Sequence, residues 1–154
     1  MIAKDIMSTK SYILHEDDDI YQAAEFMKEA KIRNLPVTNK DNQLVGIVTL
    51  REIVDYLVRK SKGNITHALG KKEDEHILRN IMIREVMAFE ASMPLKLLIE
   101  VMIDNKFGMI PIVDKQRKLL GVVSEHEIMK KLYEFVPFPK EMMVRKITEE
   151  DLSS

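Results

Sequence analysis

The chain has 154 residues and a formal net charge of −1, with 45% hydrophobic and 32% charged residues. Because positive and negative charges nearly cancel, the composition gives no electrostatic case for binding nucleic acid or an anionic membrane. Cysteine is absent, which excludes disulfides and cysteine-based zinc sites, and no stretch is apolar enough for a signal peptide or a membrane span, so we expect a soluble, cytoplasmic protein.

The chain begins with a short lead segment, residues 5–7, and an amphipathic helix. Apolar residues recur at the spacing of one helical face: Ile20, Ala23, Ala24 and Met27. A stripe of this kind is typical of a helix that packs on a core rather than of a cofactor site. We therefore predict a helix with this face turned inward.

A hairpin and a second helix follow. Two apolar runs, 35–38 and 44–48, flank the polar residues 39–42, which is the pattern of a β-hairpin. The next helix begins after Thr49, and its predicted inward residues are Ile53, Val54 and Leu57. The unit is therefore a lead segment, a helix, two strands and a second helix.

The same unit returns later in the chain. Residues 34–57 align without a gap on residues 109–132, at an offset of 75. The inward positions of the two helices are then Leu95, Leu98, Ile99 and Met102, followed by Ile128, Met129 and Leu132. A fixed offset over a whole supersecondary unit is an internal repeat. Two copies predict a pseudo-symmetric pair of half-domains, with a cleft between them where a ligand would sit.

The lead segments depart from this offset. Residues 5–7 (Asp-Ile-Met) resemble residues 85–87 (Glu-Val-Met) at an offset of 80, which predicts that the second copy has lost five residues before its first helix. On that alignment, the apolar residues between Ile77 and Met82 form a helix that leads into the second copy.

The repeat divides the chain into four regions. We assign residues 1–60 to the first repeat, 61–76 to a polar connector, 77–135 to the second repeat and 136–154 to a C-terminal tail. The tail opens with Pro-Phe-Pro, which ends the preceding helix.

The aligned residues resemble those of a known family. Each copy resembles a cystathionine-β-synthase (CBS) domain in the order of its motifs, and the two copies resemble a tandem CBS pair. The order is Ile-Met, an amphipathic helix, Leu-Pro-Val, a turn, Leu-Val-Gly-Ile-Val-Thr and a helix with an acidic residue in its first turn. The resemblance covers about residues 2–135. It implies an α+β fold of two β-α-β-β-α repeats and frequent homodimerisation. It also implies a regulatory module that binds AMP, ADP, ATP or S-adenosylmethionine between the repeats and signals to an effector protein.

The family carries Thr/Ser-x-x-Asp at the start of the second helix of each repeat. This chain matches the hydroxyl with Thr49 and Ser124 and departs from the acid with Glu52 and Glu127. The resemblance implies that the hydroxyl and the helix-start amides meet phosphate, while the acid accepts hydrogen bonds from ribose. The same four residues also fit a capping box, in which both side chains satisfy backbone donors, and glutamate suits that role better. Both interpretations stay open.

Arg33 is the candidate for a direct phosphate contact. It occupies a position where family members place an arginine or histidine that reaches the ligand phosphate, and a guanidinium matches phosphate oxygens well. A solvent-exposed arginine at a helix–strand junction is the alternative. The matching residue in the second copy is Gly108, so we expect one well-formed site rather than two.

The segment after the first Ile-Met pair is the candidate for binding the adenine. The resemblance places Ser11, Tyr12 and Ile13 along the base, where Tyr12 could stack; core packing is the alternative. In the second copy, residues 87–94 are predicted to be too short for an equal base pocket. Two prolines near the strand starts, Pro36 and Pro111, complete the candidate ligand-binding residues.

Two glycines, Gly46 and Gly121, lie inside predicted strands, where glycine indicates a bulge or a close backbone approach that packing between the repeats explains. No catalytic or metal-ligating constellation is present: the four histidines lack ligand spacing, and there is no phosphate-binding loop or nucleophile elbow. The predicted function is a regulatory ligand-binding module that is not an enzyme and needs no cofactor besides its regulatory ligand. A dimeric interaction scaffold without a ligand is the alternative.

Overall fold

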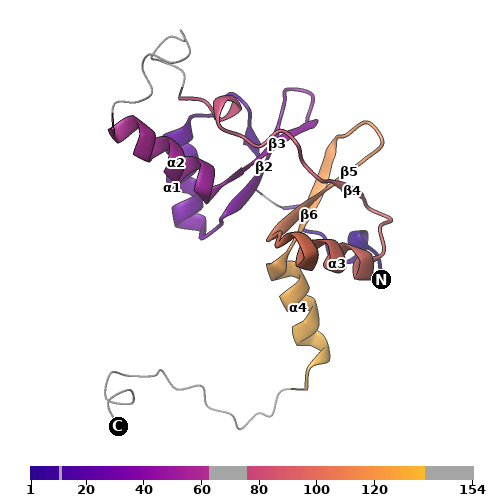
Figure 1. Ribbon diagram of the computed structural model, residues 1–154. Helices are drawn as coiled ribbons and strands as arrows, with labels where there is room; N and C mark the ends of the chain where they lie inside the picture. Colours follow the sequence, from indigo (N-terminus) through magenta and orange to yellow (C-terminus); the bar gives the residue numbers. More distant parts are fainter. Residues whose placement is uncertain (11, 63–75, 138–154) are drawn as a thin grey trace, which may run out of the picture.

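The computed structural model describes residues 1–10, 12–62 and 76–137, and it has the predicted α+β architecture of two β-α-β-β-α repeats (Figure 1). Most of the connector and of the tail lies outside the described residues. The elements of the first repeat are η1 (Ala3–Asp5), β1 (Leu14–His15), α1 (Ile20–Ala30), β2 (Asn34–Thr38), β3 (Leu44–Thr49) and α2 (Leu50–Ser61). Those of the second are η2 (Leu78–Asn80), β4 (Phe89–Glu90), α3 (Leu95–Asn105), β5 (Met109–Val113), β6 (Leu119–Ser124) and α4 (Glu125–Phe135).

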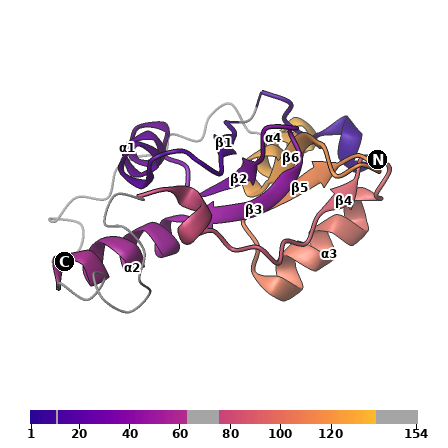
Figure 2. The same ribbon diagram turned by 90° about the horizontal axis from the view of Figure 1, so that it is seen from above.

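Each repeat forms a three-stranded sheet with the same topology. The middle strand pairs in parallel with the short first strand and antiparallel with the third, which gives the orders β1-β2-β3 and β4-β5-β6. The hairpin register shifts between Val37 and Thr38 in one sheet and between Ile112 and Val113 in the other, again 75 residues apart. Figure 2 shows the two sheets side by side between α1 and α2 on one side and α3 on the other. The internal repeat therefore extends to backbone detail.

The two hairpins meet at their turns. The amide of Leu44 donates to the carbonyl of Arg117 at 2.9 Å, and that of Leu119 donates to the carbonyl of Asn42 at 3.0 Å. Leu44, Leu119 and Val113 form a small buried cluster across this junction. The sheets are thus joined by backbone hydrogen bonds as well as by apolar packing.

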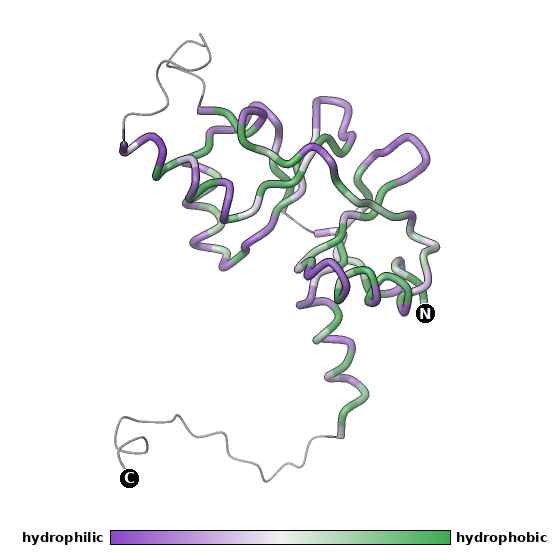
Figure 3. Tube along the Cα trace, in the orientation of Figure 1, coloured by the Kyte–Doolittle hydropathy of each residue, from purple (hydrophilic) through white to green (hydrophobic). Residues whose placement is uncertain are grey.

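The predicted stripes of α1 and α3 supply the two main cores. Ile20, Ala23 and Met27 are buried in the first core, and Leu98 and Met102 are buried in the second. In the later helix of each repeat the prediction was partly wrong, because Val54, Met129 and Leu132 are exposed by 46%, 63% and 51%. The described part of α4 has no buried residue. Figures 1 and 3 show why: α4 extends away from the sheets and carries apolar residues along its length.

The lead segments follow the offset of 75, so the predicted five-residue loss was wrong. The Ile-Met pair at residues 6–7 corresponds to Ile81 and Met82, and each pair follows a single 3-10 turn, η1 or η2. Met82 is buried in a core, whereas Met87, which we had aligned, is 45% exposed. The predicted helix over 77–82 is only this short turn. The correct alignment is the one that buries the apolar pair.

In the structure the first lead segment is formed by the described residues that precede β1, and the second by those from His76 to the start of β4. Each lead segment packs on the opposite repeat. Ala3 of η1 is buried against Leu98 and Ile110 of the second repeat, and its amide donates to the carbonyl of Met93. Leu78 of η2 is buried in the core that Ile20 belongs to. This exchange means that neither repeat, taken as a continuous stretch of sequence, contains its whole core.

The exchange explains the two strand glycines. Ser8 pairs with Val122 on β6, and Ile83 pairs with Ile47 on β3. A Cβ on Gly121 would lie 2.6 Å from the carbonyl oxygen of Ser8, and one on Gly46 would lie 2.9 Å from that of Ile83. The predicted close backbone approach is confirmed at both positions.

Candidate functional site

An open cleft of about 730 Å³ lies between the repeats. One wall comes from the first lead segment and from residues 30–36, and the other comes from the starts of β5 and α4 and from Val122 of β6. The exchange of lead segments creates this arrangement. Two hydrogen bonds between Ser8 and Val122, of 2.9 and 3.1 Å, lay the first lead segment across β6 and bring its continuation beside the N-terminus of α4.

The second-repeat wall is organised by a capping box. The amide of Ser124 donates to Oε2 of Glu127 at 3.1 Å, and the Ser124 hydroxyl donates to the same oxygen. The amide of Glu127 in turn bonds to the Ser124 side chain. Within the described residues, the other carboxylate oxygen of Glu127, Oε1, makes no hydrogen bond. The predicted capping role is confirmed, and Oε1 is left able to accept a hydrogen bond from a ligand.

The same capping box begins α2. The amide of Thr49 donates to Oε2 of Glu52 at 2.9 Å, and the Thr49 hydroxyl donates to that oxygen as well. Thr49 and Glu52 do not line the cleft, because the first lead segment runs to α4 rather than to α2. These two residues instead belong to the pseudo-equivalent junction, where Ile83 pairs with Ile47 beside the start of α2.

The first-repeat wall carries three exposed cations, Lys10, Lys31 and Arg33. Lys31 is the C-cap of α1 and has a left-handed backbone with φ of 55°. The carbonyl of Arg33 accepts a hydrogen bond from the amide of Leu50 at 2.8 Å, which fixes its backbone at the edge of the sheet. None of the three side chains forms an ion pair with any residue that the structure describes.

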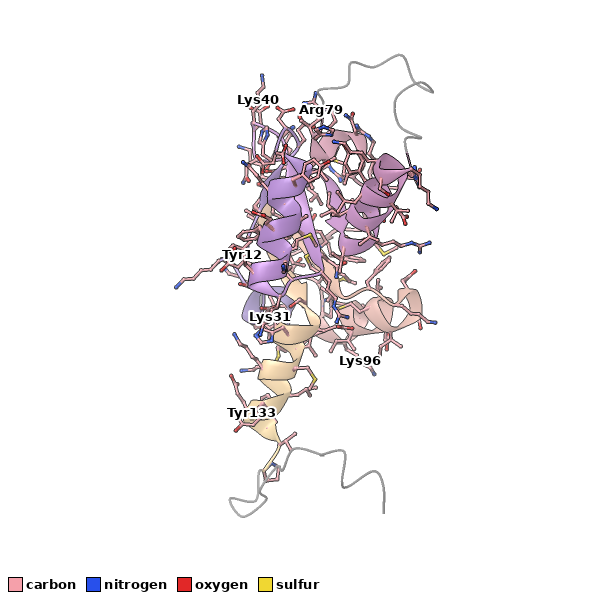
Figure 4. The ribbon with its side chains drawn as sticks, turned by 90° about the vertical axis from the view of Figure 1, so that its left-hand side faces the viewer. Tyr12, Lys31, Lys40, Arg79, Lys96 and Tyr133 are labelled. Carbon is pink, nitrogen blue, oxygen red and sulfur yellow. The ribbon has the colours of Figure 1, made fainter. Side chains whose placement is uncertain are left out.

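Tyr12 is the aromatic side chain of this wall. It is 52% exposed and its ring packs edge-to-face on Phe26, with a centroid separation of 4.6 Å. Figure 4 shows Tyr12 and Lys31 on one side of the molecule, with Lys31 close to the upper end of α4. An exposed ring that is held by an internal aromatic contact offers a face to a planar ligand.

The cleft unites half of the predicted site residues. It is lined by Tyr12, Arg33, Pro36, Ser124 and Glu127, while Thr49, Glu52, Ile13 and Pro111 lie elsewhere and Ser11 is outside the described residues. Lys10, Lys31, Glu125 and His126 also line the cleft but were not predicted from the sequence. Nothing in the local sequence marks them, because they converge only through the exchange of lead segments.

A second polar cluster lies outside the cleft and fastens α2 to the second lead segment. The hydroxyl of Tyr56 contacts Nδ1 of His76, and Nζ of Lys60 donates to Nε2 of His76 at 2.9 Å. Burial raises the pKa of the Tyr56 phenol, and a hydrogen bond with Tyr21 raises the pKa of Lys60. These contacts join α2 to the second lead segment, and we refer to Tyr56, Lys60 and His76 together as the latch.

The described residues contain no group of three or more histidine, aspartate or glutamate side chains placed to hold a metal ion. Over the same residues, no helix has the length and apolar character that crossing a lipid bilayer requires. His67 lies outside the part of the chain that the structure describes.

A scan of known families identifies the repeats. The family model described as "CBS domain" matches twice, over residues 3–59 and 78–134. The chain is 27% identical over 154 aligned positions to the uncharacterized protein MJ1426 of Methanocaldococcus jannaschii, covering 86% of this chain and 91% of the relative. It spans less than half of several longer curated relatives, among them a homoserine O-acetyltransferase of Methanohalobium evestigatum, of which it spans 24%.

Solved structures share the fold. The CBS domain pair of protein MJ0100, crystallised with 5′-methylthioadenosine and S-adenosyl-L-methionine, is 25% identical with a TM-score of 0.68, and the match covers 86% of this chain and 99% of that pair. CBSX2, crystallised with AMP, is 20% identical with a TM-score of 0.73, over 87% of this chain and 97% of that one.

Proposed function

Because this chain belongs to the CBS domain family, we propose that it is a regulatory module that binds one adenosyl ligand in the cleft between its repeats. The observation that carries the proposal is the cleft itself. Its volume of about 730 Å³ lies in the range of small-molecule sites, roughly 300–1,000 Å³, and both repeats contribute polar groups to it. The ligands of the MJ0100 pair support the adenosyl class.

Each part of such a ligand has a partner in the cleft. The adenine packs on Tyr12, and the ribose hydroxyls donate to Oε1 of Glu127. The 5′ substituent points toward Arg33 and the N-terminus of α4, where the helix dipole favours negative charge. These roles need no movement of the capping box, because Glu127 uses its other oxygen for Ser124.

The signal is a change in the packing of the repeats. The walls of the cleft come from different repeats, so a ligand that touches both favours a closed arrangement. It can shift the population only by its difference in affinity for the closed and open states. A partner protein reads the change, and the module itself performs no catalysis.

We also propose that the protein is a cytoplasmic homodimer. The exposed apolar stripe of α4, with Met129, Leu132 and Tyr133 at 63%, 51% and 68% exposure, supports a helix-mediated contact between copies. Sedimentation or light scattering of the full chain tests this. A Leu132→Lys variant is expected to be monomeric, and a monomeric parent protein contradicts the proposal.

Thermal unfolding in the presence of AMP, ADP, ATP, S-adenosylmethionine or 5′-methylthioadenosine tests ligand binding. A ligand at 100 times its dissociation constant adds about 2.7 kcal/mol of stability, which is a shift of about 5–11 °C for a chain of this size. Arg33→Ala is expected to reduce the shift from a phosphate-bearing ligand. Arg59→Ala is the matched control, because Arg59 is exposed on α2 away from the cleft.

Retained ligand must be checked first. The chain has no tryptophan and four tyrosines, so excess absorbance near 260 nm reveals a bound nucleotide, which is then stripped before the titration. No shift with any ligand on stripped protein would contradict the sensor.

That result would favour the second candidate, a scaffold without a physiological ligand. The observation in its favour is that Ser124, Thr49 and both glutamates already satisfy one another in capping boxes.

A further inference from the structure

The charge of the cleft is divided between its two walls. All three cations, Lys10, Lys31 and Arg33, come from the first repeat, from three separate segments of chain. The two carboxylates, Glu125 and Glu127, come from the first turn of α4. Convergence of separate segments distinguishes this set of cations from a run of like charges along one surface.

The three cations are unneutralised. Elsewhere, Arg79 pairs with Glu16 and Asp17, and Lys131 pairs with Glu134. The three cleft cations, like most lysines and arginines that the structure describes, have no ion-pair partner among the described residues, and what distinguishes them is that they converge on one cleft. On the opposite wall, Glu127 already accepts two hydrogen bonds through one oxygen within its capping box. Those hydrogen bonds leave the charge of Glu127 in place, so the cleft carries three cations against two carboxylates.

We infer that the cleft selects the anionic, phosphate-bearing members of the adenosyl class over the neutral and cationic ones, with Lys10, Lys31 and Arg33 as the residues that set this preference. The inference rests on the proposed function, since it concerns the same site. It orders three ligands that share an adenosine group: ADP binds more tightly than 5′-methylthioadenosine, which is uncharged, and more tightly than S-adenosylmethionine, which carries a sulfonium cation.

The physical basis is direct. Guanidinium and ammonium groups donate to phosphate oxygens in charge-assisted hydrogen bonds. A sulfonium placed among the same cations meets repulsion instead. Since the three side chains are exposed, solvent and salt weaken each contribution, and we expect a loss of about threefold to tenfold in ADP affinity per cation removed.

Isothermal titration of the full chain, stripped of retained ligand, with ADP, 5′-methylthioadenosine and S-adenosylmethionine tests the inference. We expect ADP to bind at least about tenfold more tightly than either other ligand at low salt. In a Lys10→Ala/Lys31→Ala/Arg33→Ala variant, ADP affinity should fall to the level of 5′-methylthioadenosine, whose own affinity should not change.

A control variant removes the same charge elsewhere. Lys40→Ala/Arg59→Ala/Lys96→Ala neutralises three exposed cations outside the cleft, and Figure 4 shows Lys40 near the top of the view and Lys96 well below it on α3. This variant should keep the ADP preference of the parent chain. A salt titration of the parent protein gives a second test without mutation, because raised salt should weaken ADP binding and leave 5′-methylthioadenosine unaffected.

The outcomes distinguish a failure of the charge selection from a failure of the adenosyl site itself. If 5′-methylthioadenosine or S-adenosylmethionine binds as tightly as ADP, or if both triple variants behave alike, the charge selection is wrong while the adenosyl site stands. If none of the three ligands binds, the proposed function fails, and the inference fails with it. A salt-independent preference for ADP would also overturn the role of the cations.

Discussion

The two junctions between the repeats share one backbone design and differ in chemistry. In both, a lead segment crosses a strand at a glycine and passes toward a capped helix start. At the offset of 75, however, Lys10 is replaced by Glu85, Tyr12 by Met87 and Glu125 by Leu50. One junction therefore has a cation and an aromatic ring where the other has a carboxylate and a thioether. Pseudo-symmetry of the fold does not carry over to the site.

The comparison also corrects the reason for expecting one ligand site. One ground for that prediction was the loss of five residues before the first helix of the second repeat. The structure shows lead segments of equal length, so the asymmetry lies in side chains and not in chain length. We still predict a single ligand site, now because the side chains of the two junctions differ. Mutations at equivalent positions of the two junctions can test this prediction.

The largest expected effect is on the exchanged lead segments. Leu78 is fully buried in the core of the first repeat, whereas its equivalent in the second is the small Ala3. Leu78→Ala should lower the free energy of unfolding by about 2–5 kcal/mol, measured by urea denaturation. Leu97→Ala, at a side chain that is 47% exposed, is the control and should cost much less. Equal losses would contradict the exchange.

Next in size are the two strand glycines. Gly121→Ala and Gly46→Ala should each destabilise the chain by about 1–3 kcal/mol, because the new Cβ meets the lead segment. Only Gly121→Ala should also weaken ligand binding, since it displaces the segment that carries Tyr12 into the cleft. Calorimetric titration of both variants checks this difference. An equal loss of binding would show that the two junctions are functionally alike.

The helix caps give a smaller and cleaner comparison. Ser124→Ala and Thr49→Ala should each cost about 1 kcal/mol of stability, because each removes one half of a capping box. Ser124→Ala should in addition reduce ligand affinity, while Thr49→Ala should not. Thermal unfolding with and without ligand measures both effects. Loss of affinity in Thr49→Ala alone would move the site to the other junction.

The smallest effect concerns the latch at the end of α2, which has no equivalent in the second repeat. The pKa of Tyr56 is raised by burial, so its contribution to stability is present below the unfolded-state pKa and is lost as pH rises through the folded-state value. Unfolding measured from about pH 8 to 11 should show a decline that is shallower in Tyr56→Phe. An unchanged pH profile in that variant would remove Tyr56 from the latch.

Parts of the fold could be predicted because local patterns are strong there. The stripe containing Ile20 and Met27 and the hairpin turns were read correctly, since periodicity and turn chemistry are encoded within a few residues. The exposure of Met129 was not predicted, because an apolar helix face carries the same pattern whether it packs on its own sheet or on nothing in the chain. Lys10 and Lys31 were not predicted as cleft residues for a similar reason, because an isolated lysine has no local sequence signature.

The sequence by itself determined the repeat, the fold class, the strand glycines and the capped helix starts, because each depends on residues near one another or at a fixed offset. Only the tertiary structure decided that the lead segments are exchanged, and with that exchange which residues share a cleft. Tyr12 lines the same cleft as Glu127, and not as Glu52, because Ala3 and Leu78 are buried in the opposite cores, and such long-range packing leaves no trace in the spacing of the chain.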